Sequence, residues 1–313
     1  MKSLITGVAG FIGSHLAERL LALGHHVIGM DAFLDNYDRP FKEKNLAAVI
    51  NQPAFVFLNQ DILRSDLRDL LRDISYVFHL AGQPGVRSSW GKDFVRYSNN
   101  NLMATQMLLE AAKESPPAKF VYASTSSVYG DTDDLPMREA GQTRPVSPYG
   151  VSKLAAEHLC YLYWKSYRVP TVALRFFTVY GPRQRPDMFF HILMRGLLRN
   201  EEIPLYDDGE QTRDFTYCSD IVDGVLSAGF YPGSGEVFNL GGGTETSILN
   251  AVALMEKISG RKAQLRRFDR QKGDVRHTRA SIEAARAKLD YEPRVGLEMG
   301  LARQWDWIKG LGY

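Results

Sequence analysis

The chain has 313 residues, of which 44% are apolar, and this is enough for one large or two medium-sized domains around a substantial core. Its 38 basic and 36 acidic residues leave a formal net charge of +2, so the overall charge gives no indication of nucleic-acid or anionic-membrane binding. The two cysteines lack metal-ligand spacing and no apolar stretch reaches the roughly 18 residues of a membrane span, so we expect a cytoplasmic protein without bound metal.

The first 175 residues alternate short apolar runs with helical patterns, which is typical of a parallel sheet covered on both faces. Polar and turn-forming residues at 32–40 indicate an irregular loop after the second strand. We therefore predict an α/β protein with a Rossmann-type, doubly wound parallel sheet. The predicted strands are 3–6, 26–31, 55–58, 76–80, 119–123 and 171–175, with helices that begin near residues 11, 67, 94 and 148.

The later part of the chain has a different character and predicts a smaller, mixed α/β domain. Turn signals occur at 208–209, 232–233 and 241–243, and helical patterns lie near 219–230, 247–258 and 281–289. We expect residues 1–177, completed by part of 215–240, to form the Rossmann domain and residues 178–313 to form mainly a substrate-binding domain. Because no long linker is present, we expect the two lobes to pack tightly with the site between them.

Three glycines, Gly7, Gly10 and Gly13, lie between the first predicted strand and the first predicted helix. In a dinucleotide site they permit a tight turn, close approach to a pyrophosphate and close packing of helix on strand. Asp31 ends the second predicted strand and follows Gly13 by 18 residues, near the spacing of a carboxylate that binds the adenosine ribose. A 2′-phosphate would be repelled there, so the pattern favours NAD over NADP, although Arg39 is close in sequence.

Tyr149 and Lys153 lie four residues apart in the helix predicted from residue 148. Because such residues share a helix face, we expect the Lys153 ammonium to lie beside the Tyr149 ring and to favour its phenolate. A phenol whose pKa is ordinarily near 10 could then act as a base at neutral pH. The hydroxyl-bearing residues Ser124 to Ser127 precede this pair and could hold a substrate oxygen.

These motifs together resemble those of the extended short-chain dehydrogenase/reductase family. They occur in the same order as in that family and extend over essentially the whole chain. Segments 175–184 and 213–215, with Arg276, resemble those with which nucleotide-sugar-modifying members bind a diphosphate sugar. Segments 85–90 and 184–188 further resemble bacterial UDP-glucuronate 4-epimerases. The other matching positions are Gly7 to Gly13, Asp31, Asp61-Ile62, Leu80 to Gly82, Asn101, Ser124 to Gly130 and Tyr149 to Lys153.

The resemblance implies an isomerase that binds NAD and a UDP-sugar and that inverts C4 through a 4-keto intermediate, most typically between UDP-glucuronate and UDP-galacturonate. It assigns catalysis to Thr125, Tyr149 and Lys153, with Lys153 also donating a hydrogen bond to the nicotinamide ribose. The NAD-binding residues that it implies are Gly7, Gly10, Phe11, Ile12, Gly13, Asp31, Asp61, Ile62, Leu80, Ala81, Gly82, Tyr149, Lys153 and Phe176.

Substrate binding is expected from seven further residues. Neutral hydroxyl donors could hold the carboxylate of a uronic acid, and arginines suit both a carboxylate and the diphosphate oxygens. We expect Arg213 and Arg276 at the diphosphate and Arg185 at the sugar. The full set is Arg87, Ser126, Ser127, Thr178, Arg185, Arg213 and Arg276, and no metal ligand is expected.

Other enzymes of the family that the chain resembles have different residues at the positions of Ser126 and Ser127. The 4,6-dehydratases typically carry an Asp-Glu pair there, and glucuronate decarboxylases carry a glutamate at the Ser127 position, but this chain has neither carboxylate. Dehydration needs an acid and a base, so their absence argues against that branch. The alternatives that stay open are a UDP-glucose or UDP-N-acetylglucosamine 4-epimerase, a UDP-glucuronate decarboxylase and, more remotely, a non-catalytic NAD-binding regulator.

The helix that carries Tyr149 also carries Tyr161, Tyr163, Trp164 and Tyr167. A helix that is apolar on more than one side needs a second surface to cover it, and in the family that surface is usually a partner subunit. We therefore expect a homodimer formed by this helix and the one near residues 94–113.

Overall fold

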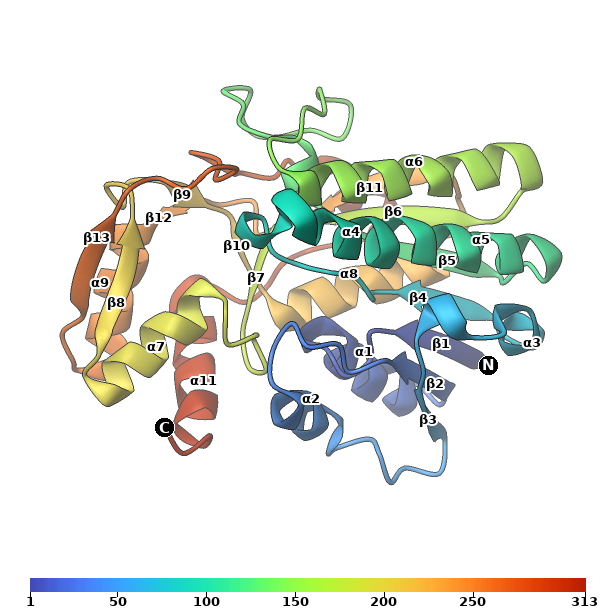
Figure 1. Cartoon of the computed structure of the whole chain (residues 1–313), viewed down its shortest axis with the longest axis horizontal. Coiled ribbons are helices and arrows are strands. Elements are labelled where there is room, and N and C mark those ends of the chain that lie inside the picture. The colour runs from blue at the N-terminus through green and yellow to red at the C-terminus, as the bar shows by residue number, and fades with distance from the viewer.

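The computed structural model describes residues 1–313, and its centre is a sheet of 7 parallel strands (Figure 1). These strands are β1 (Lys2–Thr6), β2 (His26–Asp31), β3 (Phe55–Asn59), β4 (Tyr76–His79), β5 (Lys119–Thr125), β6 (Thr171–Phe176) and β11 (Glu236–Leu240). Their order in the sheet is β11-β6-β5-β4-β1-β2-β3. The predicted Rossmann-type sheet is confirmed, and the last strand, β11, pairs with β6 from a distant part of the sequence.

The strand order creates a crevice beside β1. From β1 the chain first proceeds to β2 and β3, and it then returns to β4 on the other side of β1. Connections therefore leave β1 and β4 in opposite directions at their carboxyl ends. This is the topological switch point at which open α/β sheets bind their ligands.

Both faces of the sheet are covered by helices, as the alternation of sequence requires. Successive strand residues point to opposite faces, so Leu4 packs with α3, α5 and α6, whereas Ile5 packs with α1 and α8. The covering helices are α1 (Phe11–Ala22), α3 (Leu67–Leu71), α5 (Ala104–Glu114), α6 (Pro148–Tyr167) and α8 (Cys218–Phe230).

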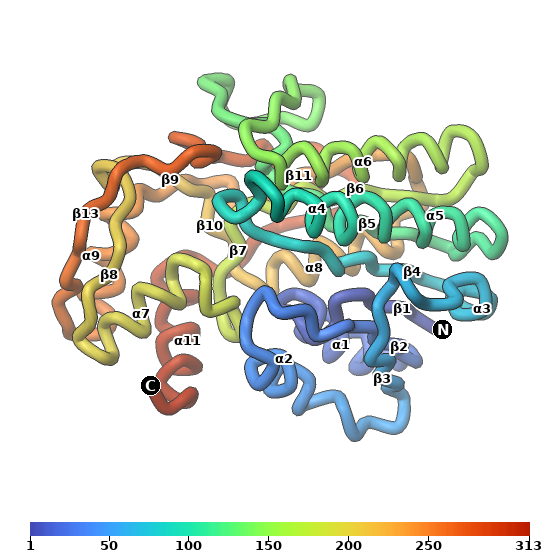
Figure 2. Tube along the Cα trace, in the orientation of Figure 1, coloured from blue at the N-terminus to red at the C-terminus, as the bar shows by residue number.

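A second lobe lies at the opposite end of the molecule from the N-terminus and contains the C-terminus (Figure 2). Its two main strands are parallel neighbours, Gln264 facing Glu202 at one end of the pair. Its principal elements are α7 (Phe189–Arg199), β8 (Glu202–Tyr206), α9 (Ile248–Ser259), β13 (Gln264–Phe268), α10 (Glu283–Leu289) and α11 (Leu297–Lys309). Shorter strands join the lobes, namely β7 (Thr178–Tyr180), β9 (Thr212–Arg213), β10 (Phe215–Tyr217) and β12 (Thr246–Ser247).

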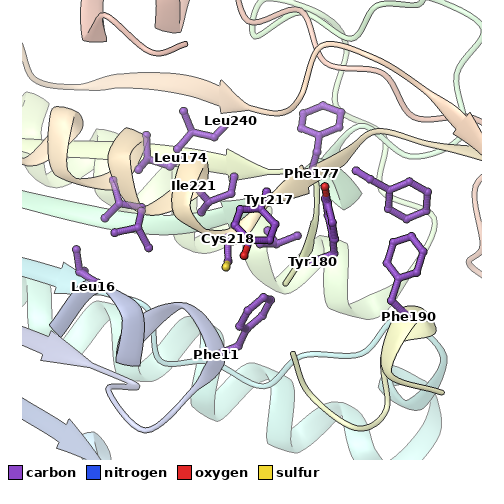
Figure 3. Close-up of a cluster of buried hydrophobic side chains, with 14 of the residues drawn as sticks. Phe11, Leu16, Leu174, Phe177, Tyr180, Phe190, Tyr217, Cys218, Ile221 and Leu240 are labelled. Atoms are coloured by element: carbon purple, nitrogen blue, oxygen red, sulfur yellow. The ribbon is translucent and has the colours of Figure 1, made fainter. Parts of the chain in front are cut away.

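The apolar core continues from the sheet into the second lobe without a break. Leu174 of β6 and Ile221 of α8 belong to the same buried cluster as Tyr180, Phe190 and Tyr217 (Figure 3). Contiguous packing of this kind holds the two lobes in a fixed relation. A cavity between them can therefore keep its shape.

Some elements differ from those predicted from sequence. The expected irregular loop at 32–40 is shorter, because α2 (Arg39–Leu46) begins inside it, with Pro40 in the first helical turn where proline is tolerated. The helix expected from residue 94 is divided into α4 (Phe94–Tyr97), a π-helical turn η4 (Ser98–Met103) and α5. A bilayer-spanning helix would need more apolar length than any helix of the structure has.

Candidate active site

A cavity of about 460 Å³ opens at the carboxyl ends of the sheet strands, at the switch point. All fourteen expected NAD-binding residues line it, together with Thr125 and four of the expected substrate-binding residues, Ser126, Ser127, Thr178 and Arg185. The other three, Arg87, Arg213 and Arg276, line an adjoining cavity of about 250 Å³ in the second lobe. Thr178 lines both cavities, so the two form one elongated site.

The turn between β1 and α1 is built for close approach of a ligand. Gly7 has φ 73°, and a Cβ there would lie 2.8 Å from the backbone nitrogen of Ala81. A Cβ on Gly13 would lie 2.3 Å from the Gly7 carbonyl oxygen, so the helix can pack against the turn only without a side chain. Gly10 caps α1 and offers no side-chain acceptor, which leaves the N–H groups of the helix terminus available to an anion.

Asp31 ends β2 at the far end of the same cavity. Its carboxylate accepts hydrogen bonds from the backbone N–H of Ala9 at 3.1 Å and of Phe33 at 2.9 Å. Burial raises the pKa of Asp31, and the two N–H donors and the Lys42 charge oppose that rise. Arg39 instead pairs with Glu43 at 2.7 Å.

Lys42 is a cavity residue that the sequence pattern did not reveal. It is buried on α2 and donates to the Leu34 carbonyl and, at 2.7 Å, to Asn36 Oδ1. It thereby fixes the loop after Asp31 around the cavity, in which Tyr37 also lies. Lys42 lies eleven residues after Asp31, and only a predicted helix at 39–46 would have placed it beside the cavity.

The catalytic residues expected on α6 reach the middle of the cavity. Ser147 caps the helix by accepting the Gly150 N–H at 3.1 Å, and Pro148 follows in the first turn. Gly150 allows the helix to approach the hydroxyl-bearing loop, because a Cβ there would lie 2.6 Å from the Ser127 carbonyl oxygen. Tyr149 is thus placed beside the loop that begins at Thr125.

The electrostatics around Tyr149 differ from the sequence expectation. Lys153 donates to the Ala123 carbonyl oxygen at 2.9 Å and lies over the Tyr122 ring, so its charge is directed to the sheet and not to the phenol. Burial raises the pKa of Tyr149, while the hydrogen bond with Thr125 and the charge of Arg185 lower it. Burial also lowers the pKa of Lys153 to about 8. The cation that acts on the phenol in this structure is Arg185.

The buried side-chain amide of Asn101 connects α6 to the loop after β4. Asn101 lies in the π-helical turn, where its Oδ1 accepts the Gln83 N–H at 2.7 Å and its Nδ2 donates to Ser152 Oγ at 2.9 Å. Ser152 in turn donates to the Tyr149 carbonyl at 2.7 Å. A Cβ on Gly82 would lie 2.8 Å from Asn101 Oδ1, so this connection requires glycine.

A second buried network lies beneath the cofactor side and fixes the charge state of His79. Thr105 donates to the Asn101 carbonyl at 2.6 Å, so its oxygen accepts from His79 Nε2 at 2.9 Å. His79 Nδ1 is then an acceptor for the Thr6 hydroxyl at 2.7 Å, while the Thr6 oxygen receives the Ala81 N–H at 3.3 Å. The imidazole is therefore neutral, and burial lowers the pKa of His79 to about 3.

Ser124, although part of the hydroxyl-bearing loop, is committed to structure. It donates at 2.7 Å to Glu157, and this carboxylate forms a buried ion pair with Arg175 of β6. Thr125 has no charged partner: its oxygen accepts the Ser127 N–H at 3.2 Å, and its hydroxyl donates to Ser127 Oγ at 3.3 Å and is also in hydrogen-bond contact with the Tyr149 phenol. Thr125 is thus available to a ligand at Tyr149.

Arg185 enters the cavity from the segment between β7 and α7. Its Nε donates to Asp187 Oδ1 and one terminal nitrogen donates to Asp187 Oδ2, both at 3.0 Å. The opposite edge of the guanidinium has no protein partner, and the charge acts on the Tyr149 phenol. The Arg185 charge and the Thr125 hydroxyl therefore both act on the Tyr149 phenol.

The arginines of the adjoining cavity are held in different ways. Arg276 donates to both oxygens of Asp208 at 2.8 Å, and Arg87 pairs with Asp274 at 2.8 Å. Arg213 has no carboxylate partner and donates only to backbone carbonyls, so burial lowers its pKa. It is the arginine best prepared to receive an anion.

Two residues of this cavity that were not predicted from sequence are Tyr206 and Arg270. Tyr206 stacks under the Arg87 guanidinium at 3.7 Å, and Arg270 lies beside Asp131, to which it donates at 2.7 Å. The cluster at 266–270 had the sequence pattern of a solvated face. Only the folded second lobe shows that one of these arginines lines a cavity.

Comparison with known proteins places this site in a family. Residues 4–304 match the family described as GDP-mannose 4,6 dehydratase. The chain belongs to this family, and the predicted membership of the extended short-chain dehydrogenases/reductases is confirmed.

Individual relatives cover nearly the whole chain. The crystal structure of UDP-glucuronic acid 4-epimerase from Bacillus cereus in complex with UDP-glucuronic acid and NAD has a TM-score of 0.97 and 46% identity over 99% of this chain and 100% of that one. An uncharacterized UDP-glucose epimerase of Bacillus subtilis is 46% identical over 99% of both chains. A UDP-glucuronate 4-epimerase of Thermodesulfobacterium geofontis is 37% identical over 98% of this chain and 95% of its own.

Proposed function

We propose that this protein is an NAD-dependent UDP-sugar 4-epimerase that interconverts UDP-glucuronate and UDP-galacturonate. The observation that carries the choice of a uronic acid is the set of groups around Tyr149. Arg185 and the hydroxyls of Ser126, Ser127 and Thr178 line the cavity there. The two carboxylates that line the cavity are Asp31, the last residue of β2, and Asp61, which follows β3. A negatively charged sugar would thus meet hydroxyl donors and the Arg185 guanidinium, which is paired with Asp187.

The residues at the strand ends fit NAD. The N-terminus of α1 has no side-chain cap and suits a diphosphate, and the glycine-lined turn has no room for a Cβ at Gly7 or Gly13. The Asp31 carboxylate would accept hydrogen bonds from the adenosine ribose hydroxyls, as the family resemblance implies. Lys153, between the Ala123 carbonyl and the cavity, would donate to the nicotinamide ribose. When bound, NAD would take up hydride from the sugar and later return it.

The protein residues would manage the proton and the orientation of the sugar. Tyr149 would accept the proton of the 4-hydroxyl, and Thr125 would hold the same oxygen. Arg185 favours the phenolate by its charge, which partly offsets the effect of burial on the Tyr149 pKa. The 4-keto sugar would then present its other face within the cavity, so that C4 is inverted and the proton returns from Tyr149.

A uronic acid adds the requirement that carbon dioxide is not lost from the keto intermediate. Decarboxylation needs the C5–C6 bond aligned with the carbonyl π system. Ser126, Ser127 and Thr178 would hold the carboxylate by neutral donors, with Arg185 supplying charge. Neither serine position carries the acid typical of the decarboxylating or dehydrating relatives.

Incubation of the purified protein with UDP-glucuronate, without added cofactor and with products followed by NMR, tests the proposal. We expect UDP-galacturonate to appear, because the NAD would be retained from expression. A pentose product would instead assign a decarboxylase. An unchanged spectrum, also after addition of NAD, would contradict both activities on this substrate.

A neutral UDP-hexose is the second candidate substrate, and one observation favours it. Asp187 neutralises Arg185 by a two-point hydrogen bond, so the sugar end is less positive than the arginine alone would make it. Conversion of UDP-glucose to UDP-galactose in the same assay, at a higher kcat/KM than for UDP-glucuronate, would support this reading.

A homodimer is the third part of the proposal. Val95 is 61% exposed, and Leu162 and Tyr161 of α6 are each 50% exposed, so α4 and α6 offer an apolar face. Tyr163 does not belong to that face, because it is buried and its hydroxyl bonds to Glu110. Sedimentation should give twice the chain mass, and the variant Leu162→Arg should sediment as a monomer.

The division of labour between lobes and a cytoplasmic location also remain proposals. Residues 1–177 with β11 would hold NAD, and residues 178–313 would hold most of the UDP-sugar. The lining of the two cavities supports this division, although Arg87 and Arg185 each serve the cavity of the other lobe. A truncated chain that retained NAD but bound no UDP would support it, and cell fractionation would test the location.

A further inference from the structure

The segment that presents Arg185 has no regular secondary structure of its own. It connects β7, which ends at Tyr180, to α7, which begins at Phe189. Arg183 lies in the left-handed region at φ 67°, and the Gln184 N–H closes a turn on the Gly181 carbonyl at 3.2 Å. Because no helix or strand holds this segment, its position depends on side chains from other elements.

The second lobe supplies one set of these contacts. Gln184 is buried, donates to the Val179 carbonyl at 3.1 Å and accepts from Gln304 of α11 at 2.8 Å. The Gly181 N–H donates to Gln304 Oε1 at 2.9 Å. These bonds fix the segment on the side of the second lobe.

The cofactor-binding helix α1 supplies the other set. His15 Nε2 lies 2.9 Å from the Pro182 carbonyl oxygen, and since a carbonyl can only accept, this nitrogen carries the proton. Burial and the Arg183 charge lower the pKa of His15, so the ring stays neutral with its single proton on Nε2. Glu18, one turn further along α1, forms an ion pair with Arg183.

The same helix therefore meets the cofactor and the segment at neighbouring turns. Phe11 lines the NAD cavity at the start of α1, and its ring packs edge-on against His15 at 6.0 Å. Pro182 and Arg183 lie only three and two positions before Arg185. A displacement of Pro182 from α1 would carry the guanidinium away from the catalytic tyrosine.

We propose that His15, assisted by Glu18, is a positioning residue that sets Arg185 relative to the bound cofactor and thereby determines the affinity for the sugar carboxylate. This inference rests on the proposed function, because it assigns a carboxylate to Arg185. It predicts an effect confined to charged sugars. The UDP part of the substrate binds in the adjoining cavity, which neither His15 nor Glu18 lines.

The experiment compares dissociation constants of UDP-glucuronate and of UDP for the NAD-loaded protein by calorimetry. His15→Leu should weaken UDP-glucuronate by about fivefold, the effect of one hydrogen bond, and leave UDP within about twofold. His15→Gln, whose amide can donate to Pro182, should recover most of the affinity. Glu18→Gln, at a partly exposed site, should weaken UDP-glucuronate in the same direction by about twofold.

The matched control is His25→Leu. His25 is buried and, like His15, makes one side-chain hydrogen bond, to Ser3 at 2.7 Å, but it lies away from the segment. It should leave the ratio of the two dissociation constants unchanged. The proposal is overturned if His15→Leu and Glu18→Gln bind UDP-glucuronate like the wild type, or if they weaken UDP equally. Failure of the wild type to epimerise UDP-glucuronate would instead contradict the proposed function, and the dissociation constants would still decide the role of His15.

Discussion

The two cavities of the site are built from different parts of the chain. The larger one is formed by backbone at the ends of parallel strands, with glycine at the closest approaches and few charged groups. The smaller one is formed largely by arginine side chains that come from distant parts of the chain and that are mostly paired with aspartates.

This difference determines how each cavity can bind an anionic ligand. The backbone donors of Phe11, Ile12 and Gly13 at the start of α1 are fixed by the fold, so a ligand there would find them already oriented. Arg87 and Arg276 must share or exchange their carboxylates when a diphosphate enters, whereas Arg213 is free of one. We therefore expect single substitutions to have concentrated effects in the first cavity and unequal effects in the second.

The largest expected effect is at the catalytic tyrosine. Tyr149→Phe removes the only proton acceptor proposed for the 4-hydroxyl, so turnover should fall by about a thousandfold or more. Binding should survive, because the ring is kept and the other residues expected to bind NAD and UDP are unchanged. Turnover is measured by NMR, and bound NAD by its absorbance after denaturation. Activity near that of the wild type would remove Tyr149 from the mechanism.

A neighbouring phenol offers a control for that result. Tyr97 packs edge-on against Tyr149 with ring centres 6.2 Å apart, and its hydroxyl donates to the Pro84 carbonyl at 2.9 Å. Tyr97→Phe changes the same chemical group outside the cavity. Its turnover should stay within about tenfold of the wild type.

The second largest effect should separate the arginines of the smaller cavity. Arg213→Ala removes a half-buried cation that has no carboxylate partner, and the affinity for UDP should fall about a hundredfold. Arg276→Ala should cost only about tenfold, because Arg276 gives up part of its bond to Asp208 when it binds phosphate. Both dissociation constants are measured by calorimetry with NAD content as a control. Equal losses would mean that pairing in the free protein does not govern the contribution of each arginine.

A third prediction concerns stability on the cofactor side. The pKa of His79 is about 3 in the folded protein, well below its ordinary value of 6.5, so the unfolded chain binds more protons between these values. Stability should therefore fall as the pH falls through 6.5 toward 3. Between pH 7 and pH 5, we expect His79 to account for about 2 kcal/mol of lost unfolding free energy.

Urea unfolding of the wild type and of His79→Gln at the two pH values measures this contribution. The variant should be less stable at pH 7, because the bonds to Thr6 and Thr105 are altered, but it should lose about 2 kcal/mol less on acidification. The other buried histidines are common to both proteins and cancel in the difference. Parallel pH dependences would show that His79 does not carry the proton-linked term.

The same contrast explains what could be predicted from sequence. The sheet and the cofactor cavity follow local rules, since Gly7, Gly13 and Asp31 stand at fixed positions relative to strands that their neighbours already indicate. β11 lies within the region expected to complete the Rossmann domain, but its place beside β6 is set by packing over a long sequence separation. Tyr206 and Arg270 became recognisable only when β8, β13 and their loops were assembled.

The environment of Tyr149 shows a second limit of local rules. The four-residue spacing places Tyr149 and Lys153 on one helix face, but it does not determine where the long lysine side chain ends. The Ala123 carbonyl accepts the Lys153 ammonium, and Arg185, from a segment far along the chain, supplies charge to the phenol. Burial, which depends on the whole fold, then has the largest effect on the pKa of Tyr149.

The smallest expected effect is a gain in affinity that follows from removing a carboxylate of the smaller cavity. Asp274→Asn removes the carboxylate that pairs with Arg87 in the smaller cavity, where Arg87 stays stacked on Tyr206. The freed guanidinium should strengthen UDP binding by about threefold, because the Arg87 side chain is 43% exposed and solvent screens such pairs. The gain should shrink at high salt, which calorimetry at two ionic strengths would measure. Weaker binding of UDP by Asp274→Asn would mean that the aspartate orients Arg87 toward the phosphate, so that pairing in this cavity prepares the site and does not compete with the ligand.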